Sequence, residues 1–147
     1  MISKEFVTAG KATFTLEVAS EFANKNNLNP HYTFSVKKKP ASMQYPETWF
    51  VSMLTGRDNE TNYSYLGILS PNNGEVHLTQ KSKLKDDSMV VKLLRKSLKR
   101  IWENQTEEIT KAGFDLHHEG RCGRCGRKLT VPESIKTGLG PECAGRV

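Results

Sequence analysis

The sequence lacks any long hydrophobic run, at its start as elsewhere. No stretch approaches the roughly 18 consecutive apolar residues that a membrane-spanning helix needs. The start of the chain, Met1-Ile2-Ser3-Lys4-Glu5-Phe6, does not contain the apolar segment of a secretory signal peptide. We therefore expect a soluble protein that works in the cytoplasm.

Cysteine is also scarce, and its placement is informative. The chain has only three cysteines, Cys122, Cys125 and Cys143, and all lie near the C-terminal end. An odd number in a chain without a secretion signal argues against a disulfide scaffold. Two other interpretations remain beside a metal site: three reduced, buried thiols without a metal, and a redox Cys-x-x-Cys pair. The redox interpretation is disfavoured because no long helix follows the pair and the third cysteine is left without a role.

The overall composition limits the size of the core and indicates the charge of a partner. The chain has 147 residues and a hydrophobic fraction of 36%, which is enough for one compact domain or a small domain with an appendage. Lys and Arg number 22 against 16 Asp and Glu, a net charge of +6. This excess favours a polyanionic partner without requiring one.

The first 80 residues have the alternation of apolar and polar side chains that is typical of half-buried strands. It predicts strands over 12–18, 32–36, 49–54, 63–69 and 76–79. The segment 20–30 is rich in Asn and is expected to be a loop, and 55–62 is expected to be a polar turn. Pro71-Asn72-Asn73-Gly74 is a hairpin signal because Asn and Gly tolerate positive φ. Short consecutive strands with short connections indicate an antiparallel meander.

A helical pattern follows, from Met89 to about Asn104, with Asp87 or Ser88 as its N-cap. At 100° per residue the apolar residues fall in one arc: Val90, Val91, Leu94, Leu98, Ile101 and Trp102. The opposite arc is cationic: Lys92, Arg95, Lys96, Lys99 and Arg100. One further turn is expected over 106–111, and 114–118 is expected to be extended. The predicted fold is α+β, an antiparallel β-meander packed by one amphipathic helix and followed by a small zinc-binding tail.

The last part of the chain has too few apolar residues to hold a fold by burial alone. Such a segment needs another source of stability, and bound metal supplies one. We therefore divide the chain into a sheet-and-helix domain, residues 1–112, and a zinc-binding tail, residues 113–147.

The tail offers ligands in the pattern that Zn²⁺ prefers. Cys122-Gly123-Arg124-Cys125 is a Cys-x2-Cys turn, in which two thiolates converge on one ion. Pro141 suits the first position of a helix, which places Cys143 in the first helical turn as the third thiolate. This arrangement is that of treble-clef and zinc-ribbon modules. His118 is the expected fourth ligand, and His117 is the reserve.

A catalytic zinc is the alternative to a structural one. It would need an open coordination position and a nearby general base. Nucleobase deaminases place a glutamate two residues after a histidine ligand, followed by Pro-Cys-x-x-Cys. Here Glu119 follows His118 directly, and no proline precedes Cys122. We therefore expect a protein without enzymatic activity.

Residues 118–143, H-E-G-R-C-G-R-C-G-R-K-L-T-V-P-E-S-I-K-T-G-L-G-P-E-C, resemble an uncharacterised family of small phage, prophage and bacterial proteins. The front half resembles longer members of that family in G-K-A-T-F-T at 10–15, W-F-V-S-M-L-T-G-R-D-N-E at 49–60 and Y-S-Y-L-G at 63–67. The resemblance implies a zinc-binding tail on a small β-sheet domain, with Cys122, Cys125 and Cys143 as ligands and His118 at a histidine position before the knuckle. It also implies a phage origin, which would place the protein in the host cytoplasm.

Basic residues provide the candidate binding surface, and two functions compete for it. The candidates are Arg121, Arg124, Arg127 and Lys128 around the knuckle, with Lys92, Lys96, Lys99 and Arg100 on the helix. The first hypothesis is a basic accessory protein that binds DNA or RNA through these cations. The second is a protein-interaction module, such as a phage inhibitor of a host factor or defence enzyme, whose cations meet an acidic protein surface. The plainest alternative for the helix cations is a solvated face.

Overall fold

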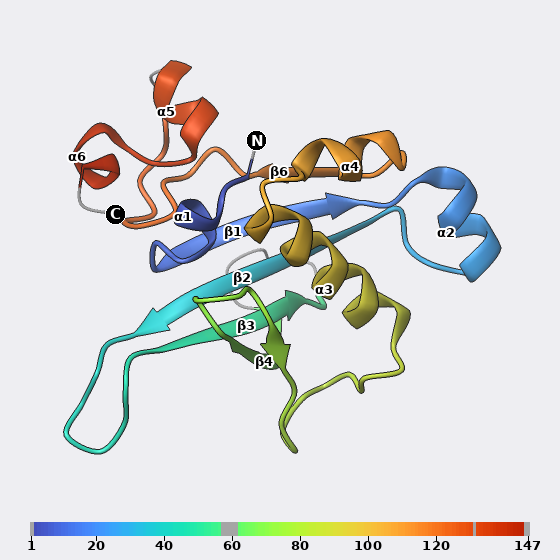
Figure 1. The fold of residues 1–147 in the computed structure, drawn as a ribbon, viewed down its shortest axis with the longest axis horizontal. Coiled ribbons are helices and arrows are strands. Elements are labelled where there is room, and N and C mark those ends of the chain that lie inside the picture. The colour runs from blue at the N-terminus through green and yellow to red at the C-terminus, as the bar shows by residue number, and fades with distance from the viewer. Residues whose placement is uncertain (1, 57–61, 131, 146–147) are drawn as a thin grey trace.

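We analysed a computed structural model, which describes residues 2–56, 62–130 and 132–145. Its centre is a six-stranded antiparallel sheet with the strand order β5-β4-β3-β2-β1-β6 (Figure 1). Each of β1 to β5 lies beside its neighbour in sequence, so the predicted meander is confirmed. The mixed α+β class is confirmed as well.

The strands lie close to where alternation predicts them. They are β1 (Lys11–Glu17), β2 (His31–Lys39), β3 (Thr48–Leu54), β4 (Tyr63–Leu69) and β5 (Val76–His77). β2 ends directly before Pro40, which lacks the N–H that a further ladder bond would need. The predicted turn between β3 and β4 falls largely on residues 57–61, which lie outside the described residues.

Helix α3 (Met89–Trp102) covers one face of this sheet (Figure 1). Its predicted apolar arc lies against the sheet, with Val91, Leu94, Leu98 and Ile101 at most 2% exposed. These side chains join Phe14, Phe34 and other inward-facing residues of the strands in one hydrophobic core. α4 (Thr106–Lys111) follows with Ile109 buried, as the expected further turn.

Two helices and one strand pairing of the sheet domain were not predicted. α1 (Lys4–Val7) is capped by Ser3, whose Oγ accepts a hydrogen bond from the Phe6 N–H. α2 (Ser20–Asn26) replaces the expected loop. It ends where Asn27 takes a left-handed conformation, and Phe22 from this helix packs on Phe114 with ring centroids 5.5 Å apart.

The pairing is that of β6 (Asp115–His118), which extends the sheet. The sequence predicts an extended conformation here, but not the pairing with β1, in which Phe14 lies opposite His118 and Leu16 opposite Leu116. The predicted boundary between residues 112 and 113 thus falls just before a strand of the sheet.

The remaining residues form the tail, with α5 (Pro132–Thr137) and α6 (Pro141–Ala144) at the end of the sheet nearest α1 (Figure 1). Gly140 is the N-cap of α6 and Pro141 takes its first turn, as predicted. No helix of the described residues is long and apolar enough to span a membrane.

Candidate metal centre

The Cys-x2-Cys segment forms a tight hairpin. The Cys122 N–H donates to the Arg127 carbonyl at 2.8 Å, and the Gly126 N–H donates to the Cys122 carbonyl at 2.9 Å. The backbones of Arg121 and Lys128 pair as an isolated antiparallel β-bridge. Gly126 takes a φ of +80°, a conformation that side chains with a Cβ rarely adopt. The backbone therefore fixes the positions from which Cys122 and Cys125 point.

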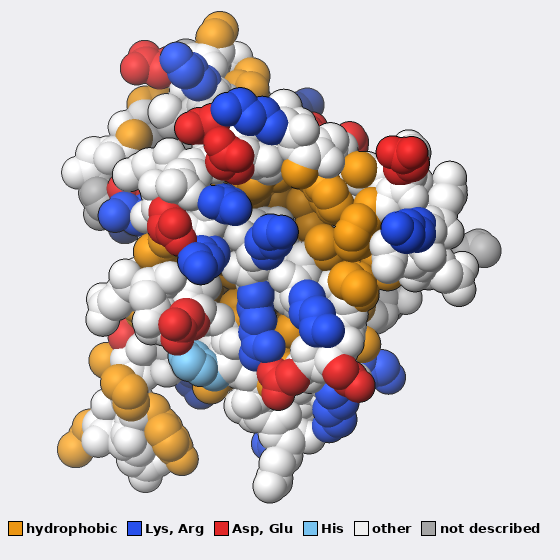
Figure 2. All heavy atoms as spheres, turned by 45° about the vertical axis from the view of Figure 1, so that its right-hand side comes forward, with side chains coloured by type: hydrophobic (Ala, Val, Ile, Leu, Met, Phe, Trp, Pro, Cys, Tyr) orange, Lys and Arg blue, Asp and Glu red, His pale blue; other side chains and the backbone are white. Residues whose placement is uncertain are grey.

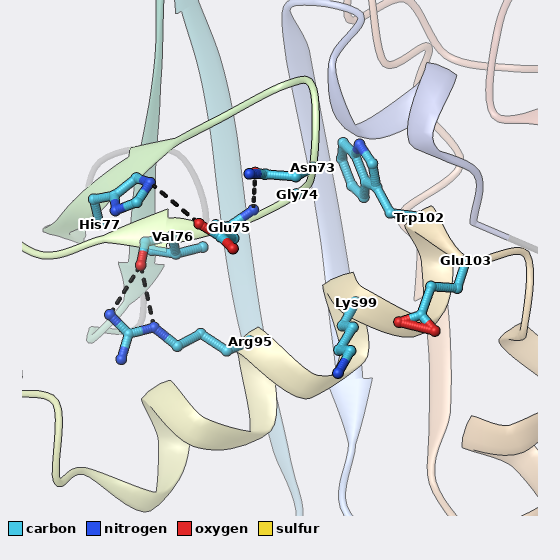
Figure 3. A pocket seen from close by; sticks show the side chains of 9 residues that line it. All are labelled: Asn73, Gly74, Glu75, Val76, His77, Arg95, Lys99, Trp102 and Glu103. Carbon is cyan, nitrogen blue, oxygen red and sulfur yellow. Dashed lines mark hydrogen bonds and ion pairs between the residues drawn. The ribbon is translucent and has the colours of Figure 1, made fainter.

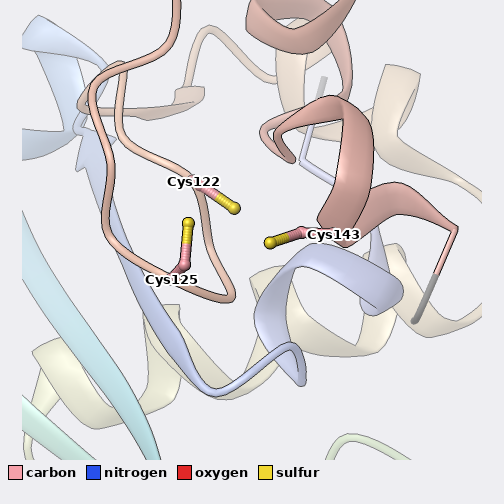
Figure 4. Close-up of side chains that lie close together, drawn as sticks. All are labelled: Cys122, Cys125 and Cys143. Atoms are coloured by element: carbon pink, nitrogen blue, oxygen red, sulfur yellow. The ribbon is translucent and has the colours of Figure 1, made fainter.

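Three thiols meet between this hairpin and α6. Figure 4 shows the side chains of Cys122 and Cys125, from the hairpin, close to that of Cys143, which comes from α6. Their sulfur atoms all lie within 4.8 Å of one another. A tetrahedral zinc site with Zn–S bonds of about 2.3 Å needs sulfurs roughly 3.8 Å apart. The three cysteines are thus preassembled, and a group that can hold a metal ion is present as predicted.

Backbone N–H groups stabilise negative charge on the most buried of these sulfurs. Cys122 is 0% exposed, and its Sγ accepts hydrogen bonds from the Arg124 N–H at 3.4 Å and the Gly140 N–H at 3.3 Å. Burial alone would raise the pKa of Cys122. Hydrogen bonds from the backbone of Gly140, Cys125 and Arg124 outweigh it and lower the pKa to about 6. A thiolate, which is the form that binds metal, is therefore accessible at neutral pH.

Cys143 behaves differently. Arg124 Nη1 donates to Cys143 Sγ at 3.6 Å, which by itself lowers the pKa of that thiol. Burial and its hydrogen bonds with Cys122 and Cys125 outweigh Arg124, so the pKa of Cys143 is raised. Three thiols packed this closely cannot all ionise without additional positive charge among them, which a bound metal ion would supply.

The expected fourth ligand does not join the thiols. His118 Nδ1 accepts a hydrogen bond from the Gly120 N–H at 2.9 Å, and Nε2 donates to the Ile135 carbonyl. Its ring also packs on Phe6, with centroids 5.6 Å apart. Both ring nitrogens are thus occupied in orienting the tail. The reserve, His117, points to the other side of β6, where Nε2 pairs with Glu17 Oε1 at 3.2 Å.

Phe6 docks the tail on the sheet domain, a role that no pattern around Phe6 predicts. A Cβ at Gly123 would lie 2.6 Å from Phe6 Cδ1, and one at Gly138 would lie 2.5 Å from the same atom. Only glycine permits such a close approach at these two positions. The Lys11 N–H adds a hydrogen bond of 2.6 Å to the Gly123 carbonyl. Gly-rich spacing in the tail was the one available clue.

The predicted basic residues divide between separate hollows. Arg124, Arg127 and Lys128 line the hollow that contains the thiols. Arg121 lies on the same hairpin, where Nη1 donates to the Gly126 carbonyl at 3.2 Å. The helix cations lie elsewhere: Lys92, Lys96 and Arg100 line a hollow between α3 and α4, and Lys99 lines another beside the β4–β5 hairpin.

The hollow beside the β4–β5 hairpin has a structural explanation (Figure 3). Arg95 donates two hydrogen bonds to the Val76 carbonyl, at 3.1 and 2.9 Å, and pairs with Asp86 at 2.8 Å. Trp102 Nε1 donates to the Pro71 carbonyl at 3.0 Å. Both side chains hold α3 against the end of the sheet.

A second group of possible metal ligands lies at the sheet edge. Glu17, Asp115 and His117 bring their ligand atoms within 4.8 Å of one another, and all three are exposed. The ion pair between Glu17 and His117 accounts for their closeness, and we assign no metal there.

Comparison with known proteins bears on the tail alone. No curated protein and no solved structure matches the chain. Residues 117–147, which contain the hairpin, α5, α6 and all three cysteines, match a family of unknown function (DUF6011). The tail is therefore similar to an uncharacterised family, in agreement with the resemblance of its sequence.

Proposed function

We propose that the chain is a non-catalytic, zinc-stabilised protein that binds nucleic acid through the cations around its thiol hairpin. The observation that carries this proposal is the hollow at the thiols, whose rim holds Arg124, Arg127 and Lys128. Arg127 and Lys128 are exposed, and within the described parts of the chain no ion pair engages either of them. Cations on a fixed hairpin lose little conformational entropy when they contact phosphate.

The donor set supports zinc with a structural role. Cysteine thiolates are soft ligands that select zinc over magnesium or calcium. Three thiolates and one Zn²⁺ leave a centre with a charge of −1, which is a weak Lewis acid. Bound zinc would neutralise the repulsion between the thiolates.

The test is fluorescence anisotropy of the zinc-loaded protein with short single- and double-stranded oligonucleotides at about 50 mM salt, where phosphate contacts are strong. The variant R127Q/K128Q removes two charges from the hairpin, and K83Q/K85Q removes two exposed charges elsewhere as the matched control. We expect only the hairpin variant to bind weakly, with a salt slope lower by roughly 0.7–0.9 for each lost phosphate contact.

No binding by the native protein under these conditions would contradict the proposal. Equal losses in the two variants would show a general charge effect instead of a site. R124Q is left out of the test, because Arg124 also contacts Cys143 and its loss would disturb the thiols.

A protein-binding function is the second candidate, and a different observation favours it. The hollow between α3 and α4 combines an apolar floor with a cationic rim.

A further inference from the structure

The outer side of α3 forms one wall of a hollow that the sheet does not fill. The hollow has a cavity volume of about 570 Å³ and lies between α3 and α4, with Phe22 of α2 and Phe114 at one end. Figure 2 shows apolar side chains gathered on this face and bordered by Lys and Arg. The apolar lining comes from Phe22, Met89, Leu93, Ile109, Ala112 and Phe114. Met89 and Leu93 lie four residues apart and remain half-buried, so α3 presents a second apolar strip besides the one on the core.

One rim of the hollow is a row of cations on α3. Lys92, Lys96 and Arg100 follow one another at intervals of four residues on α3, which is about 6 Å per step along the helix axis. Lys92 and Lys96 are exposed, and no ion pair between described residues neutralises them. Arg100 donates to the neutral Gln105 Oε1 at 2.7 Å, so its charge is also uncompensated.

The opposite rim adds little negative charge. Glu108 of α4 is the one acidic residue lining the hollow, and Lys111 Nζ pairs with it at 3.5 Å. Four cations and one carboxylate give the hollow a net charge of +3. An occupant needs apolar surface for the floor and carboxylates or other anions beside the α3 row.

We propose that this hollow is a docking groove for an acidic amphipathic helix of a partner protein. The occupant would place apolar side chains on Met89, Leu93 and Phe114, and carboxylates at four-residue intervals beside Lys92, Lys96 and Arg100. Helical side chains at i and i+4 have the same spacing as the cation row, so a helix lying along α3 can match each charge in turn.

Two features favour a helix over an extended peptide. An extended peptide gains much of its affinity by adding backbone hydrogen bonds to a sheet edge. The groove walls are helices, whose backbone groups are already paired within each helix, so they offer no such edge. A helix satisfies its own backbone and needs only side-chain contacts.

Charge and shape also disfavour a second copy of the chain or a nucleic acid as the occupant of the groove. A second copy of the chain carries +6 and would be repelled by the cationic rim. A nucleic acid would satisfy the cations, but the aliphatic part of the floor offers its bases no stacking partner. The two aromatic rings, Phe22 and Phe114, pack edge-to-face on each other. This inference does not depend on the metal or on the hairpin, because the groove and the thiols lie in different hollows.

The test is a selection of randomised 16-residue peptides, displayed on phage, against the full zinc-loaded chain. A parallel selection uses M89D/K96E, which places a carboxylate in the apolar floor and another in the cation row. Asp at the first residue of α3 is compatible with helix formation, because an N-terminal acid interacts favourably with the helix dipole. Circular dichroism and the melting temperature of each variant verify folding.

We expect peptides enriched on the native chain alone, with apolar residues at i, i+3 or i+4, and i+7 and acidic residues beside them. Anisotropy with the best labelled peptide should show at least tenfold weaker binding to K96E and to M89D. K99E, with the same charge change on the same helix but outside the groove, should stay within about twofold.

Three results would overturn the inference: no enrichment above M89D/K96E, recovered peptides without acidic and apolar periodicity, or equal losses in K99E and K96E. A single-stranded oligonucleotide that competes with the peptide and shifts the Leu93 and Ile109 amide signals would make nucleic acid the occupant instead. Oligonucleotide binding abolished by R127Q/K128Q, with peptide binding intact, would separate the groove from the hairpin.

Discussion

The sheet domain and the tail are stabilised in different ways. Among the described residues, Ile2, the sheet, α1, α3 and α4 contribute eighteen buried apolar side chains to one core. The tail cluster has five buried members, namely Ala9, Cys122, Leu129, Leu139 and Cys143, and two of these are candidate metal ligands. Burial can fold the first region, whereas the second needs its thiols held together by something other than apolar area.

The two regions nevertheless share an interface. Phe6 belongs to the sheet core and touches the tail at Gly123 and Gly138, and β6 leads directly from the sheet into the hairpin. The independence of the two regions can therefore be measured by perturbing the metal, Phe6, the thiols and the histidines in turn.

Metal removal should unfold the tail and leave the sheet domain folded. We expect purified protein to contain one zinc per chain. A strong chelator should abolish amide protection in residues 119–145, while the amides of β1 to β4 keep theirs. Hydrogen exchange followed by NMR measures both, elemental analysis gives the stoichiometry, and added zinc should restore the tail. Loss of all protection in one transition would show that sheet and tail form a single cooperative unit.

Truncating Phe6 should damage both regions, whereas truncating a phenylalanine distant from the tail should damage one. F6A should lower the free energy of unfolding by about 3–5 kcal/mol, as expected for a fully buried phenylalanine. It should also weaken zinc affinity, because the hairpin and the loop before α6 lose their shared support.

F34A is the matched control, since Phe34 is equally buried and packs on Phe14 at 5.9 Å. Urea unfolding and competition with a zinc indicator measure the two effects. Equal zinc affinities in F6A and F34A would show that Phe6 does not support the site.

Titration of Cys122 should report whether the metal-free tail keeps its fold. The pKa of Cys122 is about 6 in the folded state, below the 9.0 of an ordinary thiol, so its ionisation favours the fold. This stabilisation is fully present above pH 9 and is lost as the pH falls through about 6. Because we expect the metal-free tail to lose its order, absorbance at 240 nm should show no thiolate forming near pH 6 after chelation. A step near pH 6 that C122S lacks and C143S retains would show that the thiols stay assembled without metal.

The histidines should have the smallest effects. H118A removes hydrogen bonds to Gly120 and Ile135 and should destabilise the tail by about 1–3 kcal/mol, with less loss of zinc affinity than any Cys→Ser variant. H117A loses one exposed ion pair and should leave zinc affinity unchanged. A loss of zinc in H118A as large as in C125S would restore His118 as the fourth ligand.

The sequence predicts features that depend on local periodicity or spacing. The alternation of apolar and polar residues located the strands, and the helical projection of α3 separated its core face from its cations. The Cys-x2-Cys spacing and Pro141 located the thiols. It could not predict β6 pairing with β1, because four residues carry no signal of their partner. The orientation of the His118 ring toward Gly120 and Ile135 could not be predicted, because spacing shows proximity along the chain but not which way a ring turns. His118 as the fourth ligand stays a prediction. Phe6 was missed because its partners are glycines more than a hundred residues away.

The placement of Phe6 limits how portable the tail is. The segment that matches DUF6011 begins at His117, in the middle of β6, and it contains neither the β1 edge nor Phe6 nor Ala9. Grafted onto another protein, residues 117–147 would carry every thiol but would need from their new host an open strand edge and an aromatic ring to fill the space in front of Gly123 and Gly138. The tail therefore depends on the domain beside it. A host domain would have to supply a short helix that carries the aromatic ring and a strand with an unpaired edge.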